Sequence, residues 1–252
     1  MTTATSVTPT QRDPELLGQT VVVIGGSAGI GLETARRARA EGAQVILTGR
    51  DPERLERAAR DVGAQGAEAF DANDAASLER FLAGLPTPSD HVVVTAGGPH
   101  YGRMLDMGAE EVRSALSDPV LLALHVARHA ADRMRPGGTL LLFGGTGGRH
   151  IGLGTGLASA VTAAMPAFTA SLALELAPVR VNLIAPGFVD TPLSAAILGD
   201  GVEARREQLR NTLPIGRVVG PQDVAALAVH LMINTALTGA TYDIDGGQQF
   251  VS

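Results

Sequence analysis

The sequence predicts a single doubly wound α/β domain, with a seven-stranded parallel sheet and helices on both of its faces. Three observations lead to this fold class. Short apolar runs alternate with helical segments at regular spacing along almost the whole chain. The runs are continuously apolar, which is typical of parallel strands buried on both faces. The 252 residues are 45% hydrophobic and contain no obvious linker, so one core of full size is expected.

Each expected element follows from a local pattern. The expected strands lie at 20–26, 43–50, 67–71, 90–98, 135–145, 179–187 and 240–247, the fifth beginning with a turn. The expected helices lie at 30–42, 51–63, 75–84, 109–134, 157–177 and 220–232, with a polar helical insertion at 191–213. Asp51 is the expected N-cap of its helix, with Pro52 in the first turn. Residues 1–15 lack periodicity, so we expect a disordered tail before one domain over 16–252.

Composition excludes several kinds of function. The net charge of −6, without a basic cluster, argues against a nucleic-acid partner. No apolar run approaches the roughly 18–20 residues of a membrane span, and the first twenty residues lack a signal sequence. We therefore expect a cytoplasmic protein without a membrane partner. There are no cysteines, and we see no constellation of metal ligands. All 20 basic residues counted as Lys+Arg are arginines, which excludes lysine-assisted catalysis.

A glycine-rich turn follows the first expected strand and opens the first expected helix. In VVVIGGSAGIGLE (21–33) the glycines fall at Gly25, Gly29 and Gly31. In a Rossmann-type phosphate-binding turn, Gly25 would permit the tight turn, Gly29 would admit a pyrophosphate, and Gly31 would allow close helix packing. A structural turn is the alternative interpretation. The strand–turn–helix context favours a dinucleotide site.

The ends of the second and third strands bear on the choice of dinucleotide. A carboxylate after the second strand would bind a ribose hydroxyl and favour NAD(H), but this chain has Arg50 there. A guanidinium pairs with a 2′-phosphate, so we expect NADP(H) rather than NAD(H). A solvated arginine at a helix start is the alternative. Asp71, followed by Ala72, would accept a hydrogen bond from the adenine amino group, unless it serves as a helix cap near Asp74.

Further motifs resemble those of the short-chain dehydrogenase/reductase family over residues 18–250. TAGG at 95–98 is similar to the family's Asn-Ala-Gly, with Thr95 in place of Asn, and APGFVDTPL at 185–193 matches Pro-Gly-x-x-x-Thr. The resemblance implies that the Val189 backbone and Thr191 hold a nicotinamide carboxamide. The expected cofactor-binding residues are Gly25, Ser27, Ala28, Gly29, Ile30, Arg50, Asp71, Ala72, Ala96, Gly97, Gly98, Pro186, Gly187, Val189 and Thr191.

The chain differs from the family at the positions of the catalytic residues. Its members usually reduce a carbonyl with a Tyr-x-x-x-Lys pair, a Ser and an Asn. Alignment on SLALELAP (171–178) places Ala158 at the tyrosine position and Thr162 at the lysine position. The serine position falls on Gly145, and the asparagine position falls near Leu116 and Ser117, where Pro119 disturbs the helix. We therefore expect all four groups to be absent.

Pro166 lies four residues after Thr162 in the same expected helix. Because proline has no N–H, a continuous helix would leave the Thr162 carbonyl without its helical donor. That carbonyl would then accept a hydrogen bond from a ribose hydroxyl or a water. A simple kink of the helix is the alternative.

Other residues are candidates for the proton source. His100 and Tyr101 follow the fourth strand, Thr146, Arg149 and His150 follow the fifth, and Ser159 lies in the helix at 157–177. Loops after parallel strands are where ligands bind in such sheets, and histidine has a pKa suited to acid–base work. Each of these residues has a surface or gating role as its alternative.

Three functions fit these observations. The first is an NADP(H)-dependent oxidoreductase with a changed proton source, acting on a small apolar carbonyl, enone or imine compound. The second is a catalytically silent NADP(H)-binding regulatory or scaffold subunit, and the third is a redox-neutral lyase or cyclase. The Ala-rich face of 158–176 also favours a homodimer or homotetramer.

Overall fold

The computed structural model describes residues 13–86, 88–149 and 151–251. The strands are β1 (Thr20–Ile24), β2 (Gln44–Gly49), β3 (Gly66–Ala69), β4 (Ser89–Val94), β5 (Met134–Phe143), β6 (Arg180–Pro186) and β7 (Thr241–Ile244). The helices are α1 (Gly29–Ala40), α2 (Pro52–Val62), α3 (Ala75–Gly84), α4 (Ala109–Ala131), α5 (Gly156–Glu175), α6 (Pro192–Leu198), α7 (Val202–Thr212) and α8 (Pro221–Ile233). Four 3-10 turns complete the described chain: η1 (Met104–Asp106), η2 (Thr146–Gly148), η3 (Gly199–Gly201) and η4 (Gln248–Phe250).

The seven strands form one sheet in the order β3–β2–β1–β4–β5–β6–β7, and every pair is parallel. This confirms the expected fold class. The strand order reverses between β1 and β4, and crevices at such switch points are where parallel sheets bind ligands.

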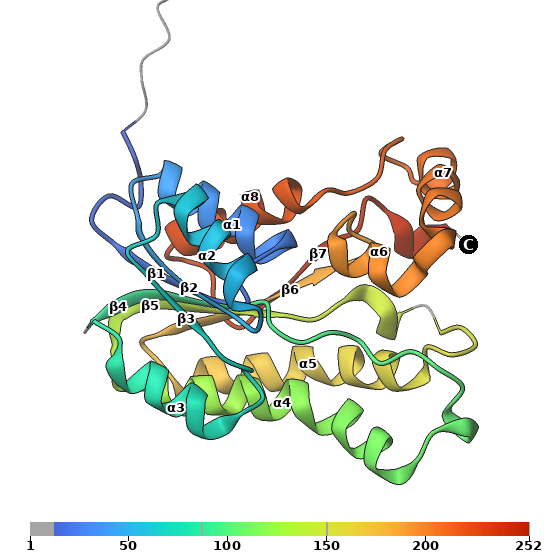
Figure 1. Cartoon of the computed structure of the whole chain (residues 1–252), viewed down its shortest axis with the longest axis horizontal. Coiled ribbons are helices and arrows are strands. Elements are labelled where there is room, and N and C mark those ends of the chain that lie inside the picture. The colour runs from blue at the N-terminus through green and yellow to red at the C-terminus, as the bar shows by residue number, and fades with distance from the viewer. Residues whose placement is uncertain (1–12, 87, 150, 252) are drawn as a thin grey trace, which may run out of the picture.

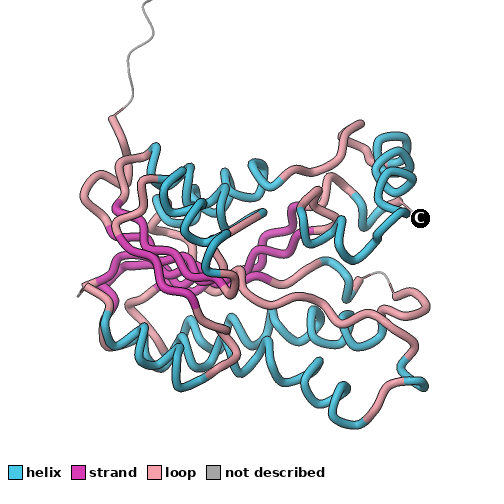
Figure 2. Tube along the Cα trace, in the orientation of Figure 1, coloured by secondary structure: helices cyan, strands magenta, loops and turns pink. Residues whose placement is uncertain are grey.

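Two layers of helices cover the sheet, as Figures 1 and 2 show. Helices α3, α4 and α5 lie on one face, and α1, α2 and α8 lie on the other, while α6 and α7 lie beyond the end of β6. Each face has its own apolar cluster, because successive strand residues point to opposite faces. Val22 and Val92 belong to the α3–α5 cluster, and Val21 and Val93 belong to the other.

Most expected elements are found within a few residues. Asp51 caps α2 by accepting a hydrogen bond from the Arg54 amide at 3.0 Å, as expected. The expected tail lies mostly outside the described residues, although the Glu15 amide donates to Glu41 Oε2 and Leu16 is fully buried.

Two expectations about helices need correction. We expected Pro119 to disturb its helix, but α4 continues through it. We expected no apolar run of membrane-spanning length, but α5 has 20 residues and enough hydropathy to cross a membrane by length and composition alone. A core helix of a folded domain passes the same test, and α5 packs against β6 and α4.

Candidate active site

The glycine turn joins the carboxyl ends of β1 and β4. Gly25 has a φ of +97°, and a Cβ there would lie 2.6 Å from the Ala96 amide nitrogen. A Cβ on Gly31 would overlap the carbonyl oxygen of Gly25 and lie 2.5 Å from Thr95 Oγ1. The Thr95 hydroxyl in turn donates to the carbonyls of Ile24 and Gly25 at 3.2 and 3.1 Å. The turn therefore requires glycine at two of the three expected positions for packing reasons.

The start of α1 is open toward this turn. Its N-cap residue, Ala28, has no side chain able to cap the helix, and its first turn contains no acidic residue. The first amides of a helix attract anions because they lack helical partners and carry the positive end of the helix dipole. Gly29 has a φ of +55°, and a Cβ there would lie 3.4 Å from the Thr191 side chain. Ser27, Ala28, Gly29 and Ile30 thus form a cradle that fits a pyrophosphate.

Arg50 lies directly after β2 and is exposed. Its neighbour Gly49 packs on Ser27, because a Cβ at position 49 would lie 2.9 Å from the Ser27 side chain. Within the described parts of the chain, Arg50 makes no ion pair or hydrogen bond. The guanidinium is therefore available to an anionic group of a ligand.

Asp71 has a turn-forming contact of its own. Its Oδ1 accepts from the Asn73 amide at 3.0 Å, and the side chain is exposed. The cap of α3 is Asp74, which accepts from the Ala76 amide at 3.1 Å. The alternative in which Asp71 caps this helix is therefore wrong, while adenine binding stays a prediction. Ala72, the next residue, is buried.

The segment after β6 has the geometry expected for a nicotinamide site. Thr191 caps α6, accepting from the Ser194 amide at 3.2 Å. The Ser194 hydroxyl donates to the Val189 carbonyl at 2.6 Å. Val189 is buried, and among the described residues nothing accepts a hydrogen bond from its amide. A buried amide without a partner is costly, so this group fits the carboxamide oxygen of a nicotinamide.

Opposite the segment after β6, the structure brings together two of the four residues that the sequence alignment assigns to the family's catalytic positions. A Cβ on Gly145 would lie 3.4 Å from Thr162 Cγ2, and Ala158 lies one turn before Thr162 on α5. The Thr162 hydroxyl donates to the Ser159 carbonyl at 3.1 Å. Gly145, Ala158 and Thr162, which the sequence alignment assigns to the serine, tyrosine and lysine positions, therefore form one small-residue wall after the end of β5.

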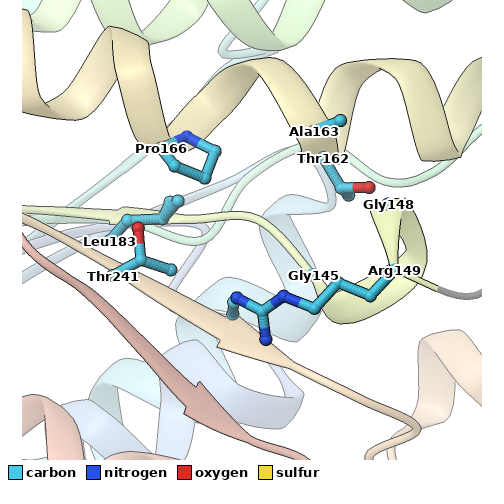
Figure 3. Close-up of a pocket in the computed structure, with 9 residues that line it drawn as sticks. Gly145, Gly148, Arg149, Thr162, Ala163, Pro166, Leu183 and Thr241 are labelled. Carbon is cyan, nitrogen blue, oxygen red and sulfur yellow. The ribbon is translucent and has the colours of Figure 1, made fainter. Parts of the chain in front are cut away.

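A pocket of about 220 Å³ lies behind this wall, between α5, η2, β6 and the start of β7 (Figure 3). Its lining consists of Gly145, Gly148, Arg149, Thr162, Ala163, Pro166, Leu183, Ala185 and Thr241. Helix α5 is continuous through Pro166, and no described group outside the helix donates to the Thr162 carbonyl. The sequence-based hypothesis of a free carbonyl at position 162 is consistent with this geometry.

Arg149 extends across the pocket toward the edge strand (Figure 3). It forms an ion pair with Asp243 of β7 and donates to Gln249 Oε1 at 3.2 Å. These contacts join the loop after β5 to the C-terminal segment, which we define as residues 243–251. No sequence signal pointed to it, because the ion-pair partners are 94 residues apart.

The candidate proton donors differ in exposure. His100 is partly buried, and it makes no hydrogen bond with any residue that the structure describes. Tyr101 is 53% exposed, and desolvation raises the pKa of its phenol, away from the value that an acid near neutrality needs. The Ser159 hydroxyl is buried and donates to Thr155 Oγ1 at 3.3 Å, while Thr146 is buried in η2. His150 lies outside the described residues.

Neighbouring loops complete the site. The Gly102 amide donates to the Gly154 carbonyl at 2.8 Å, which joins the loop after β4 to the loop before α5. A Cβ on Gly98 would lie 3.8 Å from the Leu193 side chain, so the loop after β4, which also contains Ala96 and Gly97, approaches α6 at Gly98. Within the described ranges, no group of three His, Asp or Glu residues is placed to hold a metal ion.

The family model described as enoyl-(acyl carrier protein) reductase (adh_short_C2) matches residues 25–249. The chain belongs to the short-chain dehydrogenase/reductase family. It is 30% identical to dehydrogenase/reductase SDR family member 4 of Oryctolagus cuniculus, over 94% of this chain and 96% of the relative.

Two solved structures add to this comparison. A small-chain dehydrogenase in complex with NADPH is 30% identical, with a TM-score of 0.78 over 92% of this chain and 99% of the other. The MalC reductase/Diels-Alderase of Malbranchea aurantiaca shares the fold, with a TM-score of 0.86 and 24% identity over 94% of this chain and 99% of its own. The family and its members support an oxidoreductase.

Proposed function

We propose that this protein is an NADP(H)-dependent reductase that acts on apolar compounds with a polarised C=C or C=N bond, without the usual catalytic tetrad. The observation that carries the proposal is a contrast between the two walls of the site. The amide of the buried residue Val189, which has no acceptor among the described residues, and the uncapped amides at the start of α1 suit a nicotinamide dinucleotide. The facing wall, with Ala158 and Thr162, carries no group able to act as a strong acid.

Arg50 supports NADP(H) as the form of the cofactor. It is exposed at the end of β2, next to the glycine turn, and has no partner among the described residues. One structural relative, the small-chain dehydrogenase, is in complex with NADPH. When bound, NADPH supplies a hydride to an electrophilic carbon.

The substrate class follows from whether the chain's own residues can protonate the product of hydride transfer. Reduction of a ketone leaves a strongly basic alkoxide, which requires a well-placed acid. Reduction of a conjugated C=C leaves a stabilised enolate that water protonates, and reduction of an iminium cation leaves a neutral amine. The wall at Gly145, Ala158 and Thr162 therefore suits the latter two reactions better than ketone reduction.

Exposed apolar side chains on the two loops that follow β4 and β5 support an apolar substrate. Leu105, Ile151 and Leu153 are 93%, 80% and 90% exposed. They belong to the two loops that the Gly102–Gly154 hydrogen bond joins. Exposed apolar surface on loops of this kind commonly marks a binding site.

A two-step experiment tests the proposal. Titration of the purified protein with NADPH and NADH, followed by nicotinamide fluorescence, should give tighter binding of NADPH. NADPH oxidation is then followed with matched ketones, enones and cyclic iminium ions, and the enones and iminium ions should react faster. Failure to bind either nucleotide at millimolar concentration would overturn the proposal. Binding without turnover of any substrate would favour the silent regulatory subunit instead.

We further propose that the chain forms a homodimer or homotetramer through α5. The outer face of this helix carries exposed small residues, including Ala160, Ala164 and Ala167, and an exposed Leu174. Small side chains allow two helices to approach closely. Sedimentation of the wild type and of a Ala164→Arg variant tests this; a monomeric wild type would contradict it.

A further inference from the structure

The C-terminal segment contacts the start of the expected nicotinamide site through one side chain. Gln248 Oε1 accepts a hydrogen bond from the Phe188 amide at 2.8 Å. Phe188 directly precedes Val189, the buried residue whose amide has no hydrogen-bond acceptor among the described residues. There is no space for a side chain at position 187, because a Cβ on Gly187 would lie 2.7 Å from both Gln248 Oε1 and Asp245 Cβ. The Gln248 side chain is therefore packed on the backbone of residues 187–188.

The backbone around Gln248 is itself held in place. Asp245 is 5% exposed and accepts from the amides of Gly247 and Gln249 at 2.8 and 2.9 Å. The Gln248 amide donates to the Asp245 carbonyl at 3.1 Å. Gly247 has a φ of +87°, which suits glycine at this sharp turn. These contacts fix the position from which the Gln248 side chain reaches Phe188.

The other end of the same segment is fixed by α6. The Val189 carbonyl accepts from Ser194 Oγ, and Thr191 caps the helix. Val189 thus lies between two anchors, Gln248 on one side and the α6 N-terminus on the other. A peptide unit anchored at both ends keeps the direction of its N–H bond, which is the property a site needs to orient a ligand.

We infer that Gln248 is a positioning residue for the nicotinamide end of the cofactor, acting through the Phe188–Thr191 segment. The inference rests on the proposed function, because it assigns the Val189 amide to the nicotinamide carboxamide. Gln248 itself does not touch the reacting atoms. It holds the Val189 amide in the direction that receives the carboxamide oxygen.

Two probes separate the ends of the cofactor. NADPH carries both ends, whereas adenosine 2′,5′-bisphosphate carries only the adenosine end. Gln248→Ala should raise the Kd for NADPH about tenfold, the loss expected for one buried hydrogen bond, and leave the Kd for adenosine 2′,5′-bisphosphate unchanged. Gln248→Glu keeps an acceptor oxygen at the same reach and should restore NADPH affinity to within about threefold of wild type. Gln222→Ala, an exposed glutamine at the start of α8, is the matched control.

The outcomes are distinct. If wild type does not bind NADPH, the proposed function fails and the inference fails with it. If wild type binds NADPH and Gln248→Ala binds it equally well, only the inference is overturned. An equal loss of affinity for both probes would also overturn it, because that result indicates a general structural role. Should Gln248→Ala not fold by circular dichroism, Gln248→Asn, which is one methylene too short to reach Phe188, is measured in the same way.

Discussion

Pro166 deprives the Thr162 carbonyl of the backbone donor that a residue four positions later normally provides in a helix. Helix α5 is nevertheless continuous from Gly156 to Glu175, and both residues line the pocket behind the small-residue wall. We propose that this carbonyl, at the position that the sequence alignment assigns to the family's lysine, accepts a hydrogen bond from a hydroxyl group of the cofactor ribose.

Pro166→Ala tests that assignment. Alanine restores the helical hydrogen bond, so we expect the free energy of unfolding to rise by about 1–3 kcal/mol. The Kd for NADPH should rise several-fold, because the carbonyl is no longer available to the ribose. Pro119→Ala in α4 is the matched control: it should also stabilise the protein but leave NADPH binding unchanged. Unchanged NADPH affinity in Pro166→Ala would reduce Pro166 to a structural feature.

Arg50→Ala should change the cofactor preference. Charge-assisted hydrogen bonds to a phosphate contribute about 1.5–3 kcal/mol, so NADPH should bind roughly 10–100-fold more weakly while NADH binding stays the same. Arg57→Ala is the control, since Arg57 is exposed on α2 and pairs only loosely with Glu53, at 3.9 Å. Fluorescence titration gives both constants. An equal loss of affinity for NADPH and NADH would show that Arg50 does not recognise the 2′-phosphate.

Gly31→Ala should damage the glycine turn. Alanine favours a helix interior by up to about 1 kcal/mol, but its Cβ would overlap the Gly25 carbonyl, and overpacking costs typically about 1–3 kcal/mol. We therefore expect a lower Tm and loss of NADPH binding. Gly84→Ala, at the end of α3 with nothing within 4 Å of a Cβ, should be neutral. Normal stability and binding in Gly31→Ala would contradict this packing argument.

The sequence predicted the fold and the glycine turn because both depend on local patterns. Apolar runs specify buried strands, Asp51 caps its own helix, and Gly25 and Gly31 follow one strand. Contacts between distant segments have no such signal. Gln248 meets Phe188 across 60 residues, and Arg149 meets Asp243 across 94. These contacts arise from the way the C-terminal segment folds back over the end of β6, which no periodicity records.

Restoring the family pair tests the proposed loss of the proton donor. In Ala158→Tyr/Thr162→Lys, the lysine would lower the pKa of the tyrosine, and the neighbouring pocket of about 220 Å³ provides space for the longer chain. We expect the kcat/KM for a ketone to rise about 100-fold, within the usual range for a general acid. Ala158→Phe/Thr162→Lys, without the hydroxyl, should show no gain. No increase in a double variant that folds and binds NADPH would mean that the wall lacks more than these two groups.

His91 lies near the start of β4, the central strand, at the amino ends of the parallel strands and away from the candidate site. It is 3% exposed, and its Nε2 is 2.7 Å from Gln19 Oε1. Because the Gln19 amide nitrogen donates to the Glu15 carbonyl, Oε1 is the acceptor and the His91 Nε2 carries the proton. The pKa of His91 is lowered to about 4, mainly by burial; the charge of Asp90 opposes this shift, and the charge of Arg180 adds to it.

This shift predicts how stability depends on pH. The unfolded chain protonates His91 near its ordinary pKa of 6.5, whereas the folded protein takes up that proton only near pH 4. The stabilisation is therefore complete above pH 6.5 and is lost as the pH falls toward 4. Between pH 7 and 5 it should decrease by about 2 kcal/mol. Urea unfolding of His91→Gln at both pH values should show a smaller decrease than wild type, whereas His230→Gln, at an exposed position on α8, should follow wild type. If His91→Gln loses as much stability as wild type over this range, other groups are responsible for the acid sensitivity.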